Sequence, residues 1–156
     1  MSTRQIVVGV DGSQGGRRAF AWALEQAAAT GATVQAVLAW WGDNPNTPPA
    51  DRHTDRESAQ QTLDREVQSQ PARHGVSVAA EVVEGKAADV LAAAAQSADL
   101  LVLGSHGHSR VHHTILGSVS EACIAKAPCP VVVIPVPGAP HPAAEPVPVT
   151  SETASR

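Results

Sequence analysis

The sequence predicts a doubly wound α/β domain, in which one parallel sheet carries helices on both faces. Short, β-branched apolar runs alternate with longer segments of helical spacing until about residue 135. The first run, Ile6-Val7-Val8-Gly9-Val10, is apolar at nearly every position, as is typical of a strand buried on both faces. Strands that alternate with helices favour right-handed crossovers, and these crossovers place helices on both sides of a parallel sheet.

Each element follows from a local signal. Turn residues Asp11-Gly12-Ser13 end the first strand, and Gly31 ends the helix that follows it. A Pro- and Asp-rich stretch at residues 42–55 predicts a long connection, after which Leu63 and Val67 mark the buried side of a polar helix. The predicted strands are residues 6–10, 33–41, 76–83, 100–103 and 131–134, and the predicted helices are residues 15–30, about 56–70, 87–95 and 117–126.

Composition bounds the function. The 156-residue chain has a net charge of −4, so no global positive field favours nucleic acid or an anionic membrane. No apolar run approaches the roughly 20 residues of a membrane span, and the first apolar run is too short for a secretory signal. We therefore expect a cytoplasmic protein.

The cysteines, Cys123 and Cys129, fit neither a disulfide framework nor a zinc knuckle, and we expect unreactive thiols.

The carboxyl-terminal segment differs from the rest of the chain. Prolines are interleaved with Ala, Ser and Thr beyond Pro135, and large apolar groups are almost absent. Such a segment buries too little surface to offset its ordering entropy, so residues 1–135 are the predicted domain and residues 136–156 a disordered tail. A proline-rich docking peptide is the alternative interpretation of the tail.

Two loops carry the strongest functional signals, because doubly wound sheets bind ligands beyond the carboxyl ends of their strands. The first loop places Asp11 at a strand end. The second, from Gly104 to Ser118, contains glycines that allow positive φ or close backbone approach, and it opens a helix whose unpaired amides attract anions. These features predict a phosphate cradle. The alternative is a glycine-rich loop followed by a capping box, since Ser118-Val119-Ser120-Glu121 fits S-x-x-E.

The spacing Gly104-x2-Gly107-x9-Gly117-Ser118 resembles the nucleotide-binding signature of the universal stress protein family. The resemblance extends from Ile6-Val7-Val8-Gly9-Val10-Asp11-Gly12-Ser13 to Pro130-Val131-Val132-Val133-Ile134-Pro135. It implies a Rossmann-like, five-stranded parallel sheet in the order 3-2-1-4-5 and a homodimer formed through the last strand, Val131 to Ile134. It also places the sequence in the subgroup that binds ATP, with or without Mg²⁺.

The resemblance implies a role for each matching position. Val10, Asp11 and Trp40 would line an adenine pocket, the loop would wrap ribose and phosphates, and the first turn of the following helix would meet the phosphates. The loop positions are Gly104, Ser105, His106, Gly107, His108, Ser109 and Arg110, and the helix positions are Gly117, Ser118, Val119 and Ser120. Arg110 departs from the family pattern, in which another glycine is common.

Other chemistries find less support. The sequence lacks the G-x-x-x-x-G-K-[ST] of a P-loop and the G-x-S-x-G of a nucleophile elbow. His106 and His108 alternate in the loop, but no carboxylate or cysteine accompanies them, so no metal site is predicted.

We predict an ATP-binding stress-response regulatory module with an unidentified protein partner. The alternatives are a slow ATPase or phosphotransfer enzyme and a dimeric interaction protein that binds no nucleotide.

Overall fold

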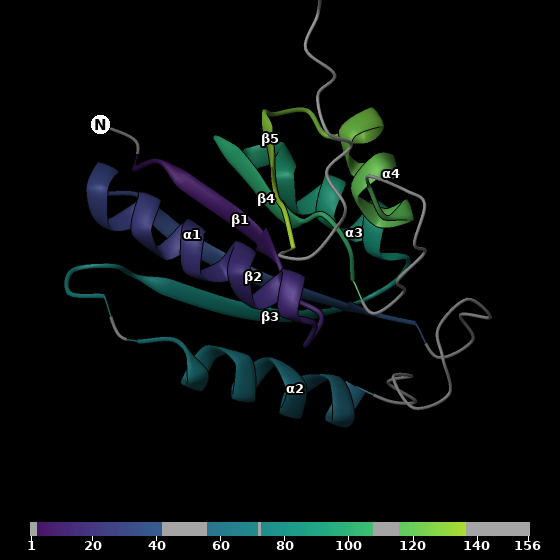
Figure 1. Cartoon of the computed structure of the whole chain (residues 1–156), viewed down its shortest axis with the longest axis horizontal. Coiled ribbons are helices and arrows are strands. Elements are labelled where there is room, and N and C mark those ends of the chain that lie inside the picture. Colours follow the sequence, from purple (N-terminus) through teal and green to yellow (C-terminus); the bar gives the residue numbers. More distant parts are fainter. Residues whose placement is uncertain (1–2, 42–55, 72, 108–115, 137–156) are drawn as a thin grey trace, which may run out of the picture.

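The computed structural model describes residues 3–41, 56–71, 73–107 and 116–136, and it shows the predicted alternation of strands and helices (Figure 1). Several expected features lie outside these residues: the connection at 42–55, the loop residues His108, Ser109 and Arg110, and the tail beyond Val136. The strands are β1 (Gln5–Gly9), β2 (Thr33–Trp40), β3 (Val78–Glu84), β4 (Leu100–Gly104) and β5 (Val131–Ile134), and the helices are α1 (Gln14–Thr30), α2 (Arg56–Ser69), α3 (Ala87–Ala94), the 3₁₀ turn η2 (Ala95–Ser97) and α4 (Ser118–Lys126).

The sheet has the expected architecture. Its five strands lie in the order β3-β2-β1-β4-β5, and every neighbouring pair is parallel. In the central strand β1, Ile6 pairs with Val34 of β2 on one side and with Leu100 of β4 on the other. Because all strands run the same way, their carboxyl ends meet at one edge of the sheet. The predicted doubly wound sheet is confirmed, and so is the order 3-2-1-4-5 that the family resemblance implies.

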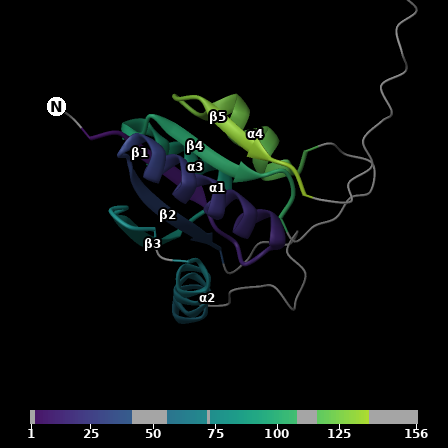
Figure 2. The same ribbon diagram turned by 60° about the vertical axis from the view of Figure 1, so that its left-hand side comes forward.

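Helices cover both faces of the sheet, α1 and α2 on one side and α3 and α4 on the other (Figure 2). Side chains alternate between the two faces along each strand. In β1, Val8 joins the core under α1 and α2, whereas Val7 joins the core under α3 and α4, and both are fully buried. This double burial explains why residues 6–8 are a continuous apolar run.

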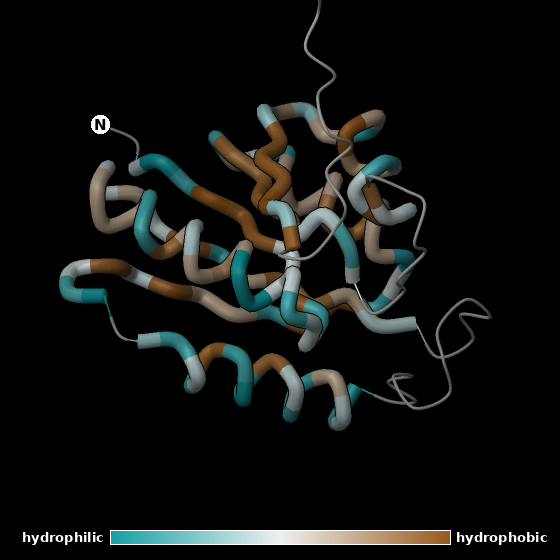
Figure 3. The backbone as a smooth tube through the Cα atoms, in the orientation of Figure 1, coloured by the Kyte–Doolittle hydropathy of each residue, from teal (hydrophilic) through white to brown (hydrophobic). Residues whose placement is uncertain are grey.

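Hydropathy follows this arrangement (Figure 3). Apolar residues run continuously along the central strands, whereas α2 alternates between apolar and polar residues, as a helix with one buried side requires. Leu63 is fully buried in α2, and Val67 packs against the same core, as the spacing predicted. In the described part of the chain, no helix combines the length and apolarity needed to cross a bilayer.

Helix α1 is capped at both ends by residues that the sequence singled out. The Oγ atom of Ser13 accepts a hydrogen bond from the Gly16 amide at 3.1 Å, which satisfies one of the unpaired amides of the first turn. At the other end Gly31 has φ +75°, a left-handed conformation, and its amide donates to the Ala27 carbonyl. The two caps fix α1 between Asp11 and the start of β2.

The burial of Leu63 generates a first prediction. Leu63→Ala should lower the free energy of unfolding by about 2–5 kcal/mol, because the substitution leaves a cavity between α2 and the sheet. Denaturant titration measures this loss. Ile124→Ala is the matched control, since Ile124 is 50% exposed and its truncation should cost about 0.5 kcal/mol or less. Equal losses in the two variants would contradict this account of α2 packing.

Cys123 generates a prediction about pH. Burial in the core under α3 and α4 raises the pKa of the Cys123 thiol to about 11. An unfolded chain releases this proton at about pH 8.5. The unfolded state therefore binds fewer protons between these values, and stability falls as pH rises from about 8.5 to 11. Relative to Cys123→Ala, the wild type should lose at most about 3 kcal/mol across this window. Unfolding titrations at several pH values test this; a constant difference would contradict it.

Candidate functional site

The candidate site lies at the carboxyl edge of the sheet, where the turn after β1 meets the segment after β4. Doubly wound sheets bind ligands at this edge, next to the point where the strand order reverses. Here that point lies between β1 and β4, because the chain adds β2 and β3 on one side of β1 and then β4 and β5 on the other. The structure thus brings Asp11 and the loop that begins at Gly104 to one place.

The Asp11 carboxylate is held within its own turn and faces the second loop. Its Oδ1 atom accepts hydrogen bonds from the amide of Ser13, at 2.9 Å, and from the Ser13 hydroxyl. A Cβ atom on residue 16 would lie 2.6 Å from Oδ1, and one on residue 107 would lie 2.7 Å from Oδ2. Glycines at positions 16 and 107 therefore leave the room that this carboxylate occupies.

The first turn of α1 packs directly on the end of β4. A Cβ atom on Gly104 would lie 2.6 Å from the carbonyl carbon of Gly15, and one on Gly15 would lie 2.4 Å from the carbonyl oxygen of His106. Both distances are far shorter than any real Cβ contact. The two backbones can approach this closely only because neither residue carries a side chain.

Ser105 joins three segments of the edge. Its amide donates to the Ile134 carbonyl at 2.9 Å, and its carbonyl accepts from the Gly117 amide at 2.6 Å. Its Oγ atom accepts from the Val136 amide at 3.2 Å. Ser105 is buried, so these bonds fix the ends of β4 and β5 and the start of α4 relative to one another.

The start of α4 differs from the predicted capping box. The helix begins at Ser118 and its N-cap is Gly117, so Ser118 is one position too late to cap it, and the capping-box interpretation is wrong. Among the described residues no side chain caps this end. Ser118 and Val119 are exposed, whereas the buried Ser120 donates its hydroxyl hydrogen bond to the Gly104 carbonyl at 2.8 Å.

The glycines from the end of β4 to the start of α4 do not adopt positive φ, one of the two roles that the sequence suggested for them. In the described residues positive φ occurs at Gly12, Gly31, Gly75 and Gly85, and not at Gly104, Gly107 or Gly117. The absent side chain matters instead: each of the three has a neighbouring atom within 3.2 Å of where a Cβ would stand. Close approach, the other expectation for these glycines, is what the structure contains.

The remaining expected site residues occupy different surroundings. Val10 is buried in the core under α1 and α2, and its amide donates to the Val37 carbonyl at 2.9 Å. Trp40 ends β2 and is half-buried against the same core. Its neighbour Trp41 is 38% exposed, and the Lys86 ammonium lies 5.3 Å from its ring centroid. The described residues contain no group of three His, Cys, Asp or Glu side chains able to hold a metal ion.

This edge has two polar elements of opposite character. Asp11 contributes a carboxylate at the β1 end, which suits hydrogen-bond donors such as amino or hydroxyl groups. The first turn of α4 presents main-chain amides and the positive end of a helix dipole, which attract anions. A ligand with donors at one end and negative charge at the other matches this arrangement.

Taken together, the strand order and this edge define a doubly wound α/β domain whose candidate binding site is the edge between β1 and β4. The model of the universal stress protein family matches residues 2–135 of the chain. Universal stress protein Rv2624c of Mycobacterium tuberculosis is 32% identical over 133 residues, which are 84% of this chain and 48% of that protein. The chain belongs to the universal stress protein family, and it spans about half the length of the curated relatives it matches.

Solved structures of the family share the fold. A universal stress family protein from Burkholderia pseudomallei is 32% identical, with a TM-score of 0.60 over 85% of this chain and 96% of that one. A universal stress protein in complex with cAMP has a TM-score of 0.61 at 24% identity, over 86% of this chain and 98% of that one. The Archaeoglobus fulgidus protein in complex with dAMP has a TM-score of 0.58 at 23% identity, over 86% of this chain and 99% of that one.

Sequence reasoning missed the residues that hold Asp11 in place. The pattern predicts a turn at Ser13 and a helix that includes Gly15 and Gly16, and it does not predict the cap that Ser13 forms. Glycine is a poor helix former, by about 1 kcal/mol relative to alanine in a helix interior, so two adjacent glycines in a helix are unusual. That cost is a signal of close packing at these positions. Nothing in the local sequence pointed to the ion pair between Arg17 and Glu66, which are far apart in the chain.

The contact between Gly104 and Gly15 generates a further prediction. Gly104→Ala should lower the free energy of unfolding by about 1–3 kcal/mol or more, because its Cβ would overlap the Gly15 backbone. Gly31→Ala is the control: its Cβ would lie in open space, so only the left-handed backbone adds a cost, about 1 kcal/mol. Urea denaturation compares the two. A greater loss for Gly31→Ala would count against close packing as the constraint at Gly104.

Proposed function

We propose that this protein binds an adenine nucleotide at the carboxyl edge of its sheet and acts as a stress-response regulatory module. One observation carries the proposal: the Asp11 carboxylate and the start of α4, which lacks a side-chain cap among the described residues, both border the segment 105–107. The universal stress proteins in complex with cAMP and dAMP support the choice of an adenine nucleotide.

ATP is the nucleotide we propose first, with or without Mg²⁺. The hydrogen-bonding groups of the residues at this edge suit the parts of ATP. Asp11 suits the amino or hydroxyl groups of an adenosine, and the Ser118 hydroxyl and the first-turn amides of α4 suit a phosphate. Gly107 leaves space beside Asp11, since a side chain there would meet the carboxylate. In this proposal Val10 and Trp40 line the adenine side, and residues 104–110 lie along ribose and phosphates.

Regulation would operate by linkage. A nucleotide shifts an equilibrium only by its differential affinity for two states, so a partner protein or a second copy must distinguish the occupied from the empty edge. Ser105 supplies a physical connection, because it bonds both to Gly117 at the edge and to Ile134 at the end of β5. We further propose that β5, an outer strand whose residues are all half-buried, pairs with its copy in a homodimer.

Residues 1–135 are the proposed functional module, with residues 136–156 as an appended tail. The family model ends at the same boundary, residue 135.

Asp11 lies in the turn after β1 and accepts hydrogen bonds from Ser13, so ATP hydrolysis would require another group to position the attacking water. A slow ATPase or phosphotransferase is therefore an outcome for experiment, as is a dimer that binds no nucleotide.

The proposal predicts micromolar ATP binding by the purified chain, measured by calorimetry with ADP, AMP, cAMP and GTP in parallel. The double variant Gly117→Ala and Ser118→Ala should bind ATP at least about tenfold more weakly, a loss of about 1.4 kcal/mol. Its new Cβ at position 117 lies 3.2 Å from the Ser105 carbonyl, and it loses the exposed hydroxyl at 118.

Ser97→Ala is the matched control, since Ser97 lies before β4 at the opposite edge of the sheet. Its ATP affinity should equal that of the wild type. Phosphate release is measured on the same samples, and release that disappears in the double variant would assign hydrolysis to this site. No binding by the wild type at millimolar ATP would refute the nucleotide proposal and leave the dimeric interaction protein.

A further inference from the structure

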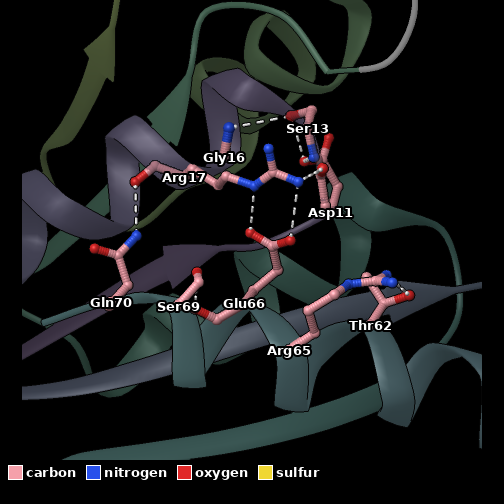
Figure 4. Close-up of polar contacts among 10 residues, drawn as sticks. Asp11, Ser13, Gly16, Arg17, Thr62, Arg65, Glu66, Ser69 and Gln70 are labelled. Atoms are coloured by element: carbon pink, nitrogen blue, oxygen red, sulfur yellow. Dashed lines mark hydrogen bonds and ion pairs between the residues drawn. The ribbon is translucent and has the colours of Figure 1, made fainter.

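Arg17 connects α2 to the turn that carries Asp11 (Figure 4). From the first turns of α1, its Nε atom donates to Glu66 Oε2 at 2.9 Å, and its Nη2 atom donates to Glu66 Oε1 at 3.3 Å. The same Nη2 atom donates to the carbonyl oxygen of Gly12 at 3.1 Å. One guanidinium group therefore lies between a helix on the sheet face and the turn at the candidate site.

Glu66 depends on this contact. Its side chain is 2% exposed, whereas that of Arg17 is 52% exposed. A buried carboxylate is stable only when it is paired and hydrogen-bonded, and Arg17 forms both of the ion-pair contacts described for Glu66. The hydrogen bond to Glu66 also raises the pKa of Arg17. In addition, Gln70 of the segment after α2 donates to the Arg17 carbonyl at 3.2 Å.

The bond to Gly12 acts on Asp11 through a single peptide unit. The Gly12 carbonyl and the Ser13 amide belong to the same planar group, so orienting one fixes the other. That amide donates to Asp11 Oδ1 at 2.9 Å. Arg17 therefore contacts one end of a rigid unit while Asp11 contacts its other end. Gly12 itself has φ +80°, a left-handed conformation that lets the turn take this course.

We propose that Arg17, with Glu66 as its buried counter-ion, is a positioning residue that holds the Asp11 carboxylate in the orientation that adenine-nucleotide binding requires. This inference rests on the proposed function. It adds α2 to the site, because the helix supplies the counter-ion although none of its described residues is among the expected ligand contacts. Detaching Arg17 should turn the Gly12–Ser13 peptide and release Asp11 while the sheet stays intact.

The test uses the full chain and two readouts. In ligand-free protein, hydrogen exchange of the Ser13 amide reports the bond to Asp11, and calorimetry reports ATP affinity. Arg17→Ala should accelerate Ser13 exchange and weaken ATP binding about tenfold, the scale of one charge-assisted hydrogen bond. Glu66→Gln, which keeps the shape and removes the charge, should change both readouts in the same direction. This variant replaces Arg17→Ala in the test if Arg17→Ala is too unstable to purify.

Two further variants separate positioning from stability. Arg18→Ala is the matched control, since Arg18 donates to the Pro135 carbonyl at 3.2 Å and not to Gly12 or Glu66. It should leave Ser13 exchange and ATP affinity unchanged. Arg17→Lys keeps the charge beside Glu66, but an ammonium lacks the planar fork that reaches two acceptor groups. Compared with Arg17→Ala, Arg17→Lys should bring the melting temperature back towards the wild-type value. Its Ser13 exchange should stay fast and its ATP affinity should stay low.

Each outcome bears on one proposal. Ser13 exchange in Arg17→Ala equal to that in Arg18→Ala would overturn the positioning role. Full recovery of both readouts in Arg17→Lys would also overturn it, since charge alone would then suffice. Faster Ser13 exchange in Arg17→Ala, in a protein whose wild type binds no ATP, would support the hold on Asp11 and refute the nucleotide proposal.

Discussion

The Gly15 backbone excludes a side chain at Gly104, the His106 carbonyl excludes one at Gly15, and the candidate site depends on this close packing. It sets the first turn of α1 against the end of β4. The turn that carries Asp11 precedes α1 directly, so its distance from the second loop is fixed by the same contact. A larger residue at either position would separate two halves of the site that come from opposite sides of the strand-order reversal.

Two helix starts lie at this edge, and they differ in a way that bears on function. The start of α1 satisfies its Gly16 amide internally, through Ser13, which is itself bonded to Asp11. The start of α4 receives no side-chain cap from the described residues, and Ser120 turns inward to Gly104 instead. The first helix is thus built to hold a carboxylate in place. The second presents first-turn amides of the kind that bind anions in other proteins.

The sequence predicted the fold well because period and burial are local signals. Residues 6–8 are apolar on both faces, and Gly31 ends its helix, so strand and helix positions followed from the pattern. The strand order came from the family resemblance. Contacts between distant residues had no such signal: neither the Arg17–Glu66 pair nor the Gly15–Gly104 approach leaves a periodic trace. The capping-box alternative failed because the helix starts one residue earlier than the S-x-x-E pattern required, so that Gly117 and not Ser118 is its N-cap.

The strand order also affects how the chain is made. During synthesis β1 emerges first and obtains β2 as a neighbour early, but its other neighbour, β4, is made only after β3 and α3. Until then β1, apolar on both faces, is an open edge of a three-stranded sheet and a template for pairing with other chains. The nascent half-domain is therefore prone to aggregation until β4 has left the ribosome and paired with β1.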